Sequence, residues 1–421
     1  MASSPVFSRR RFIGGLGVAA MAGLAETAFG GDANGASAQA TASKPSRPQD
    51  YLLDPGLIHL NTASLGATPR KVLDSTMAAW RKLESNPVPM AYAHGPGEDS
   101  VLADAERVRG VAAGFLGCDA DEILITHGTT DGMNIVAQGL RWNAGDRVLT
   151  TDQEHEGGNL CWQYTARRHG VAIDAIAIVP GEHDPEAILR RFADAIVPAT
   201  RVISVSHVTT STGLRMPIAG IAALARKRGI LCIVDGAQAA GGIAVDVKAL
   251  GCHAYATSGH KWLMGPKGTG ILYVSREASE AIAPIPWQES HLYGAQSAGV
   301  SPLTLAVGLG TAIGLIQSIG IASVESHDLA LRDRAYAGLM GIKGIRMASP
   351  PPGPQATPLI ACILPDAIDS VALRKAMLSK HRINVKSVEK RWFNGFRLSP
   401  HILNTESEID QVLRALREEL A

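Results

Sequence analysis

The stretch Ile230-Leu231-Cys232-Ile233-Val234-Asp235-Gly236-Ala237-Gln238 joins a short apolar run to an acidic turn. A second apolar run, Ala254–Ala256, leads into Ser258-Gly259-His260-Lys261, whose lysine lies 26 positions after Asp235. Short apolar runs bounded by turns are typical of buried strands. Because ligands collect at the carboxyl ends of strands in α/β sheets, we expect Asp235 and Lys261 to face one site.

Short apolar runs alternate with helical stretches along most of the chain. Further β-rich runs occur at Glu122–Thr126, Arg147–Thr150, Val171–Val179, Arg201–Ser206 and Ile271–Val274. Stretches with helical spacing, such as Pro185–Ala195 and Pro217–Arg228, lie between most of these runs. This alternation predicts an α/β fold with a largely parallel sheet.

A third candidate element is the turn His127-Gly128-Thr129-Thr130-Asp131-Gly132, between the run that ends at Thr126 and the helical stretch Met133–Leu140. Free amides and the positive dipole end of a helix can bind phosphate there, and two threonines add hydroxyls. Such a turn by itself is more often an ordinary helix cap, because Thr and Asp are favoured at caps. Its place before Asp235 and Lys261 favours the phosphate site.

A lysine, an acid and a phosphate turn together meet the needs of pyridoxal phosphate. This cofactor is an electron sink held by a lysine Schiff base, and it works best when a carboxylate keeps its pyridine nitrogen protonated. An acid and a lysine at two strand ends can meet one flat ring from two sides. We therefore expect Lys261 and Asp235 to hold pyridoxal 5'-phosphate.

The order of the motifs adds a family resemblance. From about residue 50 onward the chain resembles class V aminotransferases in Gly128-Thr129-Thr130, Glu154-His155, His207–Gly213, Asp235-x-x-Gln238 and Ser258–Lys261. Asn61–Gly66 and the Thr-rich 207–213 segment are most similar to the isopenicillin N epimerase-like branch, and the chain is also similar to exported enzymes that tailor the pyoverdine chromophore. The resemblance implies a fold-type-I transferase: a mostly parallel seven-stranded sheet in a large domain, a smaller α+β C-terminal domain, and a homodimer.

The resemblance also implies roles for individual residues. Lys261 is expected to hold the cofactor and then to shuttle a proton, and Asp235 to pair with the pyridine nitrogen. His155 is expected to stack on the ring and Gln238 to bond the ring hydroxyl. The other cofactor-binding residues that it implies are Thr129, Thr130, Thr210, Ser258 and His260. Structural alternatives stay open, since His155 and His260 could shape turns and Asp235 could cap a helix.

Arg397, in Phe396-Arg397-Leu398-Ser399-Pro400-His401, is the expected anchor of the substrate α-carboxylate. The planar guanidinium binds a carboxylate bidentately, although an interdomain salt bridge is a competing interpretation. The resemblance also places Asn61 at the substrate. Lys386 and Arg391 are nearby cations that could recognise a side-chain carboxylate.

Two departures from the family pattern limit what carries over. Where class V enzymes have a Gly-Thr pair that reaches the neighbouring subunit's phosphate, this chain reads Ser297-Ala298-Gly299-Val300-Ser301-Pro302. Cysteine desulfurases need a mobile nucleophilic cysteine before the C-terminal strand, and Ile383–Gly395 contains none. Ordinary persulfide chemistry is therefore disfavoured.

These residues predict an enzyme that acts at the Cα of an amino acid or of an amino-acid-containing substrate. Return of a proton to Cα gives epimerisation, return to the cofactor gives transamination, and a β-leaving group gives elimination. An epimerase or transaminase, with siderophore or other secondary-metabolite tailoring as its role, is our main interpretation. A C–S or other β-lyase is the alternative, and a non-catalytic periplasmic binding protein is the alternative of another class.

The first forty residues read as an export signal. Ser8-Arg9-Arg10-Arg11-Phe12-Ile13 is a twin-arginine motif, Ile13–Leu24 is a small-residue apolar stretch, and Ala36-Ser37-Ala38 and Ala38-Gln39-Ala40 are candidate cleavage sites. A basic disordered N-terminus is the alternative. We expect the twin-arginine export machinery as a partner and a periplasmic or otherwise exported location. No apolar run of about 18 residues occurs in the body, so no stable membrane anchor is expected.

Composition and the positions of loop-forming residues predict the remaining partners and the domain boundaries. The chain has 421 residues, 46% of them hydrophobic, and a net charge of +1, so no nucleic-acid partner is expected. Five widely spaced cysteines without a C-x-x-C pair predict free thiols, and the thirteen histidines form no metal motif, so no metal site is expected. We expect a signal at 1–40, a linker and arm at 41–74, a large cofactor domain at 75–302, and a connecting helix with a small domain at 303–421.

Overall fold

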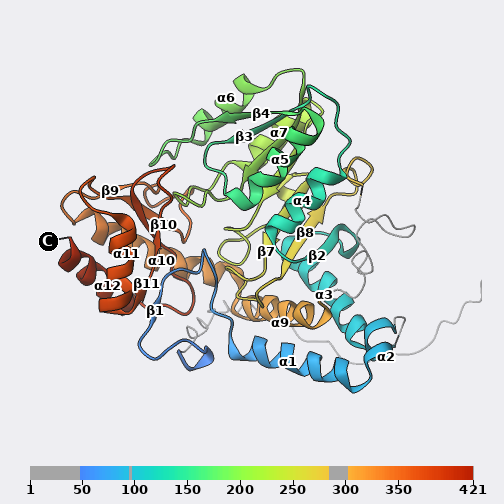
Figure 1. Cartoon of the computed structure of the whole chain (residues 1–421), viewed down its shortest axis with the longest axis horizontal. Coiled ribbons are helices and arrows are strands. Elements are labelled where there is room, and N and C mark those ends of the chain that lie inside the picture. Colours follow the sequence, from blue (N-terminus) through green and yellow to red (C-terminus); the bar gives the residue numbers. More distant parts are fainter. Residues whose placement is uncertain (1–47, 94–96, 284–301, 421) are drawn as a thin grey trace, which may run out of the picture. The chain divides into compact units, whose positions relative to one another are not determined.

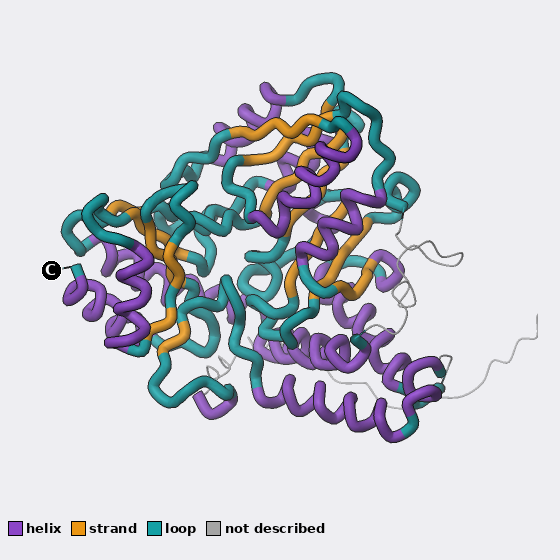
Figure 2. Tube along the Cα trace, viewed as in Figure 1, coloured by secondary structure: helices purple, strands orange, loops and turns teal. Residues whose placement is uncertain are grey.

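The computed structural model of the chain describes residues 48–93, 97–283 and 302–420. The described residues belong to one compact unit. The predicted export signal and most of the 297–302 segment lie outside the described residues. Figure 2 shows the strands gathered into separate sheets with helices packed around them.

The largest sheet has seven strands in the order β2-β8-β7-β6-β5-β3-β4. The strands are β2 (Ile123–Thr126), β3 (Arg147–Thr151), β4 (Ala172–Ile176), β5 (Thr200–Ser206), β6 (Leu231–Asp235), β7 (Ala254–Ser258) and β8 (Gly270–Val274). Only β8 runs antiparallel to its neighbours, while all other pairings in this sheet are parallel. The predicted mostly parallel seven-stranded sheet is confirmed, and the carboxyl ends of six strands meet at one edge.

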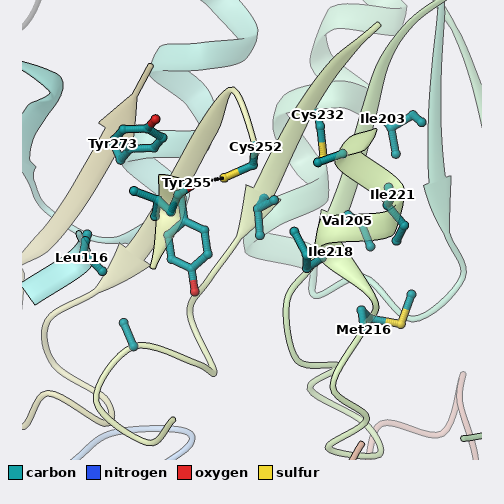
Figure 3. Packing of buried hydrophobic residues seen from close by; sticks show 14 of the residues in the cluster. Leu116, Ile203, Val205, Met216, Ile218, Ile221, Cys232, Cys252, Tyr255 and Tyr273 are labelled. Atoms are coloured by element: carbon teal, nitrogen blue, oxygen red, sulfur yellow. Dashed lines mark hydrogen bonds between the residues drawn. The ribbon is translucent and has the colours of Figure 1, made fainter. Parts of the chain in front are cut away.

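Helices cover both faces of this sheet because its strands are apolar on both faces. Cys232 packs on one side with α3 (Val101–Leu116), α6 (Pro185–Ala195), α7 (Ile218–Lys227) and α9 (Leu303–Ile319). The next residue, Ile233, packs on the other side with α4 (Thr129–Gly139) and α5 (Glu156–His169). Figure 3 shows the first of these layers, in which Ile218 and Ile221 of α7 lie beside strand residues. Each fully buried aliphatic side chain of this kind contributes roughly 1.5–3 kcal/mol.

The second sheet is antiparallel and lies in the C-terminal part of the chain. Its order is β12-β13-β10-β9, with β12 (Lys386–Ser387), β13 (Gly395–Leu398), β10 (Ile360–Ile363) and β9 (Arg346–Met347). Helices α10 (Ile321–Met340), α11 (Ser370–His381) and α12 (Glu406–Glu419) pack with it around a separate apolar core (Figure 1). The confirmed fold class therefore includes the smaller α+β part that the sequence predicts.

One short stretch of this part, 383–388, is divided between two strands. It forms β11 (Ile383–Asn384), which pairs with β1 (Ile58–His59), and then β12, which pairs with β13. The chain changes partner at Val385 because an N-terminal strand, distant in sequence, occupies the first two positions. This exchange brings Lys386 opposite Arg397.

The remaining helices are α1 (Arg70–Ser85), α2 (Pro87–Tyr92) and the short α8 (Val247–Leu250). Short 3-10 turns occur at Pro48–Asp50 and Ala120–Glu122. The predicted domain boundaries stay predictions. Across the described part of the chain no single helix has the length and hydropathy of a membrane span, and α9 and α10 reach them only as a pair bent by 79°.

Candidate active site

The carboxyl edge of the seven-stranded sheet opens into a cavity of about 330 Å³. One side, which we call the large-sheet wall, consists of Thr129, Thr130, His155, Gly157, Gly158, Thr210, Asp235, Ala237, Gln238, His260 and Lys261. The opposite part, which we call the small-sheet wall, consists of Lys386, Ser387, Val388, Glu389, Trp392 and Arg397, and Ala63 and Ser64 complete the lining. Nine of the eleven predicted site residues therefore line one cavity, and the other two, Ser258 and Asn61, do not.

Asp235 and Lys261 reach this cavity from adjacent parallel strands. Asp235 ends β6, where it pairs in register with Ala256 of β7, and Lys261 follows the end of β7. The Asp235 carboxylate accepts a hydrogen bond from the amide of Ala237 at 2.9 Å. Burial raises the pKa of Asp235, and the positive charge of Lys261 partly opposes this. Burial lowers the pKa of Lys261 to about 8, against the effect of Asp235. Each group thus favours the charged form of the other.

The predicted phosphate turn lies at the start of α4. The helix begins at Thr129, four residues earlier than its apolar spacing predicts, because Gly128 at φ +154° turns the chain from β2 directly into it. Ser258 supports this turn from behind the cavity lining: its Oγ accepts from the Thr129 amide at 3.2 Å and lies 2.8 Å from Thr129 Oγ1. His260 Nδ1 is buried without a partner among the described residues. The start of the helix leaves backbone amides available to an anion.

His155 stands at the start of α5, where its Nδ1 accepts from the amide of Gly157 at 3.0 Å. Its ring keeps an exposed edge, yet partial burial first and the charge of Lys261 second lower the pKa of His155 to about 4. The imidazole is therefore neutral near pH 7. It lines the cavity as an uncharged ring, and its expected stacking on the cofactor stays a prediction.

Two glycines after His155 keep the large-sheet wall open. A Cβ at Gly158 would lie 2.3 Å from Asp235 Oδ2, and a Cβ at Gly157 would lie 2.5 Å from Thr130 Oγ1. Both positions must therefore lack a side chain. Sequence reasoning did not identify them, although the Gly-Gly pair directly after Glu154–Glu156 was a usable signal.

Gln238 is engaged by the protein on both ends of its amide. Nε2 donates to the carbonyl of Ala63 at 2.9 Å and to Thr210 Oγ1 at 3.3 Å, and Oε1 accepts from Trp262 Nε1 at 2.9 Å. The side chain consequently ties the turn after β6 to the segment that follows Lys261. Its expected bond to a ring hydroxyl stays a prediction.

Arg397 is buried on the small-sheet wall and is held by neutral oxygens. Nη1 donates to the carbonyl and the hydroxyl of Thr210, both at 2.9 Å, and Nη2 donates to Ser64 Oγ at 3.0 Å. Nε is buried without a partner, and no salt bridge joins Arg397 to any described acid. Burial lowers the pKa of Arg397 to about 10. A buried cation without a counterion is suited to binding an anion.

The structure places Asn61 behind this site rather than in its lining. Its backbone forms a bridge with Ser399, and its Oδ1 is buried without a partner among the described residues. The neighbouring Ser64 lines the cavity instead and contacts Arg397. Sequence reasoning quoted the segment that contains Ser64 but did not single it out, and the expected role of Asn61 at the substrate stays a prediction.

A lysine and an acid at adjacent strand ends, with a helix N-terminus beside them on a mostly parallel sheet, define a pyridoxal phosphate enzyme of fold type I. The chain belongs to the class V aminotransferase family, whose model matches residues 58–414. Members of this family are pyridoxal phosphate enzymes.

Individual relatives include both epimerases and desulfurases. The isopenicillin N epimerase of Amycolatopsis lactamdurans is 29% identical over 87% of this chain and 96% of its own length. A probable cysteine desulfurase of Pseudomonas aeruginosa is 32% identical over 70% of this chain and 76% of its own length. Among solved structures, the C-DES mutant with glycine covalently linked to its pyridoxal phosphate has a TM-score of 0.76 at 24% identity, covering 86% of this chain and 97% of that one, which shows a shared fold.

Proposed function

We propose that this enzyme acts at the Cα of an amino acid or of an amino-acid-containing substrate, as an epimerase or a transaminase, and that it tailors a siderophore or another secondary metabolite. The observation that carries the proposal is that Lys261, Asp235 and Arg397 line a single cavity. A base, an acid and a carboxylate anchor within one site are the groups that chemistry beside a substrate carboxylate needs.

The residues present fit pyridoxal phosphate. Gly158 leaves Asp235 Oδ2 open to the cavity, where any Cβ would block it. The start of α4 suits a phosphate. When bound, the cofactor supplies an electron sink for the bond that breaks at Cα. Asp235 would face its ring nitrogen, and Lys261 would hold its aldehyde carbon.

The chain's own groups bind and orient the substrate and move the proton. Arg397, fixed by Thr210 and Ser64, presents a preorganised guanidinium to the α-carboxylate. Lys261 Nζ, with its pKa lowered to about 8, can take up the Cα proton and return it near neutral pH.

Desulfurisation through a persulfide on this chain is less favoured than proton transfer at the substrate Cα. None of the described residues that line the cavity is a cysteine. Cys161, on α5 behind the large-sheet wall, is buried, and burial raises the pKa of its thiol to about 12, with Asp235 adding to the effect. A thiol of this kind is neither ionised nor accessible, which argues against persulfide formation on this chain.

An absorption spectrum tests the proposal. The purified protein reconstituted with pyridoxal phosphate should show a visible band that shifts when an amino acid is added, and Lys261→Ala should lose it. Lys227→Met, on the exposed end of α7, is the matched control and should keep it. Product mass and chirality then separate an epimerase from a transaminase and a β-lyase. A wild-type protein without the band would leave only the binding-protein alternative.

We further propose export and dimerisation, on the strength of the twin-arginine motif and the family resemblance. The substitutions Arg9→Lys and Arg10→Lys should retain the protein in the cytoplasm, which cell fractionation measures. Light scattering on the purified protein should give the mass of two chains. Cytoplasmic wild-type protein would refute export, and a monomer would refute dimerisation.

A further inference from the structure

Two cations lie next to each other on the small-sheet wall. Lys386 of β12 and Arg397 of β13 are direct partners in the antiparallel register. Both side chains line the cavity, so they project from the same face of the sheet. Direct cross-strand partners have Cβ atoms about 4.5–5.5 Å apart, and like charges at such positions destabilise the sheet. An arrangement of this kind calls for a compensating anion.

No described acid forms an ion pair with either cation, and the charge of Glu389 only partly offsets the two. Arg397 donates only to neutral oxygens of Thr210 and Ser64, and Lys386 forms no hydrogen bond or ion pair with any described residue. The only acid on this wall is Glu389, whose Oε2 accepts from Arg391 Nε at 2.9 Å, so it already has a cation of its own. Burial first and the charge of Arg397 second lower the pKa of Lys386, and the weaker effect of Glu389 does not reverse this.

The position of Lys386 also favours a ligand over solvent. The lysine is half-buried, beside Val388 and Trp392. Trp392 Nε1 donates to the carbonyl of Asp152 at 2.9 Å, and the Arg391 guanidinium lies 4.3 Å from the Trp392 ring centroid, so this rim is fixed against the loop after β3. A charged group that meets Lys386 here loses part of its water, which strengthens the interaction.

We propose that the substrate carries a second carboxylate, which Lys386 binds while Arg397 holds the α-carboxylate. The substrate class is then a dicarboxylic amino acid or an amino-acid derivative with a distal carboxylate. This inference rests on the proposed function, because it takes Arg397 as the α-carboxylate anchor. It assigns to Lys386 the selection of the substrate, a role separate from the chemistry at Lys261.

Calorimetric titration of the holoenzyme with glutarate and with butyrate tests the assignment, because the two acids differ in one carboxylate. Glutarate should bind at least about tenfold more tightly than butyrate, as expected for one added charge-assisted hydrogen bond. Lys386→Met should reduce glutarate affinity to that of butyrate and leave butyrate unchanged. Lys386→Arg should keep the preference, and Lys390→Met, an exposed lysine four positions along the same loop, should have no effect.

Two results would overturn the inference. An equal loss of glutarate and butyrate affinity in Lys386→Met would mean that both cations share one carboxylate. An unchanged glutarate affinity would mean that Glu389 neutralises the lysine. The retained butyrate affinity shows that the variant is folded. The proposed function is tested separately, since it fails only if amino acids leave the cofactor band unchanged, whatever the calorimetry shows.

Discussion

On the large-sheet wall an acid and a base stand together, Asp235 and Lys261, whereas on the small-sheet wall two cations, Lys386 and Arg397, stand together. The first pair balances its own charge in a buried setting. The second pair has neutral partners or none among the described residues. The contrast favours a division of roles: the large-sheet wall binds the cofactor, and the small-sheet wall binds a negatively charged substrate.

The walls also differ in how they are built. The large-sheet wall consists of turns that directly follow parallel strands, with glycines where groups approach closely. The small-sheet wall depends on the register of two short antiparallel strands and on a loop fixed to the large sheet through Trp392. Changes in the first wall should therefore affect chemistry and cofactor affinity, and changes in the second should affect substrate affinity.

The largest effect is expected for Lys261→Ala. Loss of the general base should slow exchange of the substrate Cα proton at least on the order of 10³-fold. Proton NMR in D₂O measures this exchange whichever product forms, with the amino acid that most shifts the cofactor band as substrate. Lys227→Met should exchange at the wild-type rate. An exchange rate in Lys261→Ala within tenfold of the wild-type rate would mean that another residue is the base. The large-sheet wall would then no longer be distinguished by an acid–base pair.

A large effect on stability is expected for Glu154→Gln, just behind the large-sheet wall. Glu154 accepts from Thr151 Oγ1 at 2.7 Å and from the Ser206 amide at 3.3 Å, and burial raises its pKa to about 7. The folded protein keeps this proton while the unfolded chain releases it near pH 4.5. Between pH 4.5 and about 7 the wild type should therefore lose roughly 3 kcal/mol relative to the variant.

Urea denaturation of both proteins at pH 4.5, 6 and 8 measures this difference. The unfolding free energy of the wild type should fall relative to that of the variant from pH 4.5 to 7. Above pH 7 the difference should stay constant, because Glu154 is then ionised in both the folded and the unfolded protein. Parallel curves would show that Glu154 ionises normally. The large-sheet wall would then hold one more negative charge beside Asp235.

The large-sheet wall could be predicted from the sequence because each of its motifs is contiguous. A strand, a turn and a helix start are encoded within about ten residues, so Thr129, Asp235 and Lys261 were placed correctly in one cavity. The seven strands followed from the same local pattern. The helix starting at Thr129 was predicted four residues late, because the conformation of Gly128 leaves no trace in apolar spacing.

The small-sheet wall could be predicted only in part. The contact between Arg397 and Ser64 joins residues 333 positions apart, and no local pattern encodes it. The division of residues 383–388 between β11 and β12 depends on pairing with β1, so the opposition of Lys386 and Arg397 is a tertiary property. Asn61 was selected from a resemblance alone, and its backbone bridge to Ser399 is likewise a tertiary contact.

A smaller effect is expected for Gly158→Ala on the large-sheet wall. The added methyl would lie 2.3 Å from Asp235 Oδ2, so the carboxylate or α5 must shift. Crowding of this size typically costs about 1–3 kcal/mol, which should raise the cofactor dissociation constant about tenfold or more. Absorbance titration of the cofactor-free protein measures it. Gly114→Ala on α3, where a methyl meets nothing within 4 Å, is the control, and equal affinities in the two variants would show that Asp235 does not contact the cofactor.

The smallest effect is expected for Thr210→Val, which changes the support of the substrate anchor and also removes the longer contact from Gln238 Nε2 at 3.3 Å. The variant removes the hydroxyl that accepts from Arg397 Nη1 at 2.9 Å but keeps the Thr210 carbonyl at the same distance. Loss of one such hydrogen bond is worth about 1 kcal/mol, so the KM for the substrate should rise about fivefold. The value of kcat should stay within about twofold, because Arg397 binds the substrate and transition state alike. Thr210→Ser retains the hydroxyl and should restore the wild-type KM. A fall in kcat with KM unchanged would mean that Thr210 acts on the chemistry rather than on substrate affinity. Substrate binding and chemistry would then not be separated between the supports of the two walls.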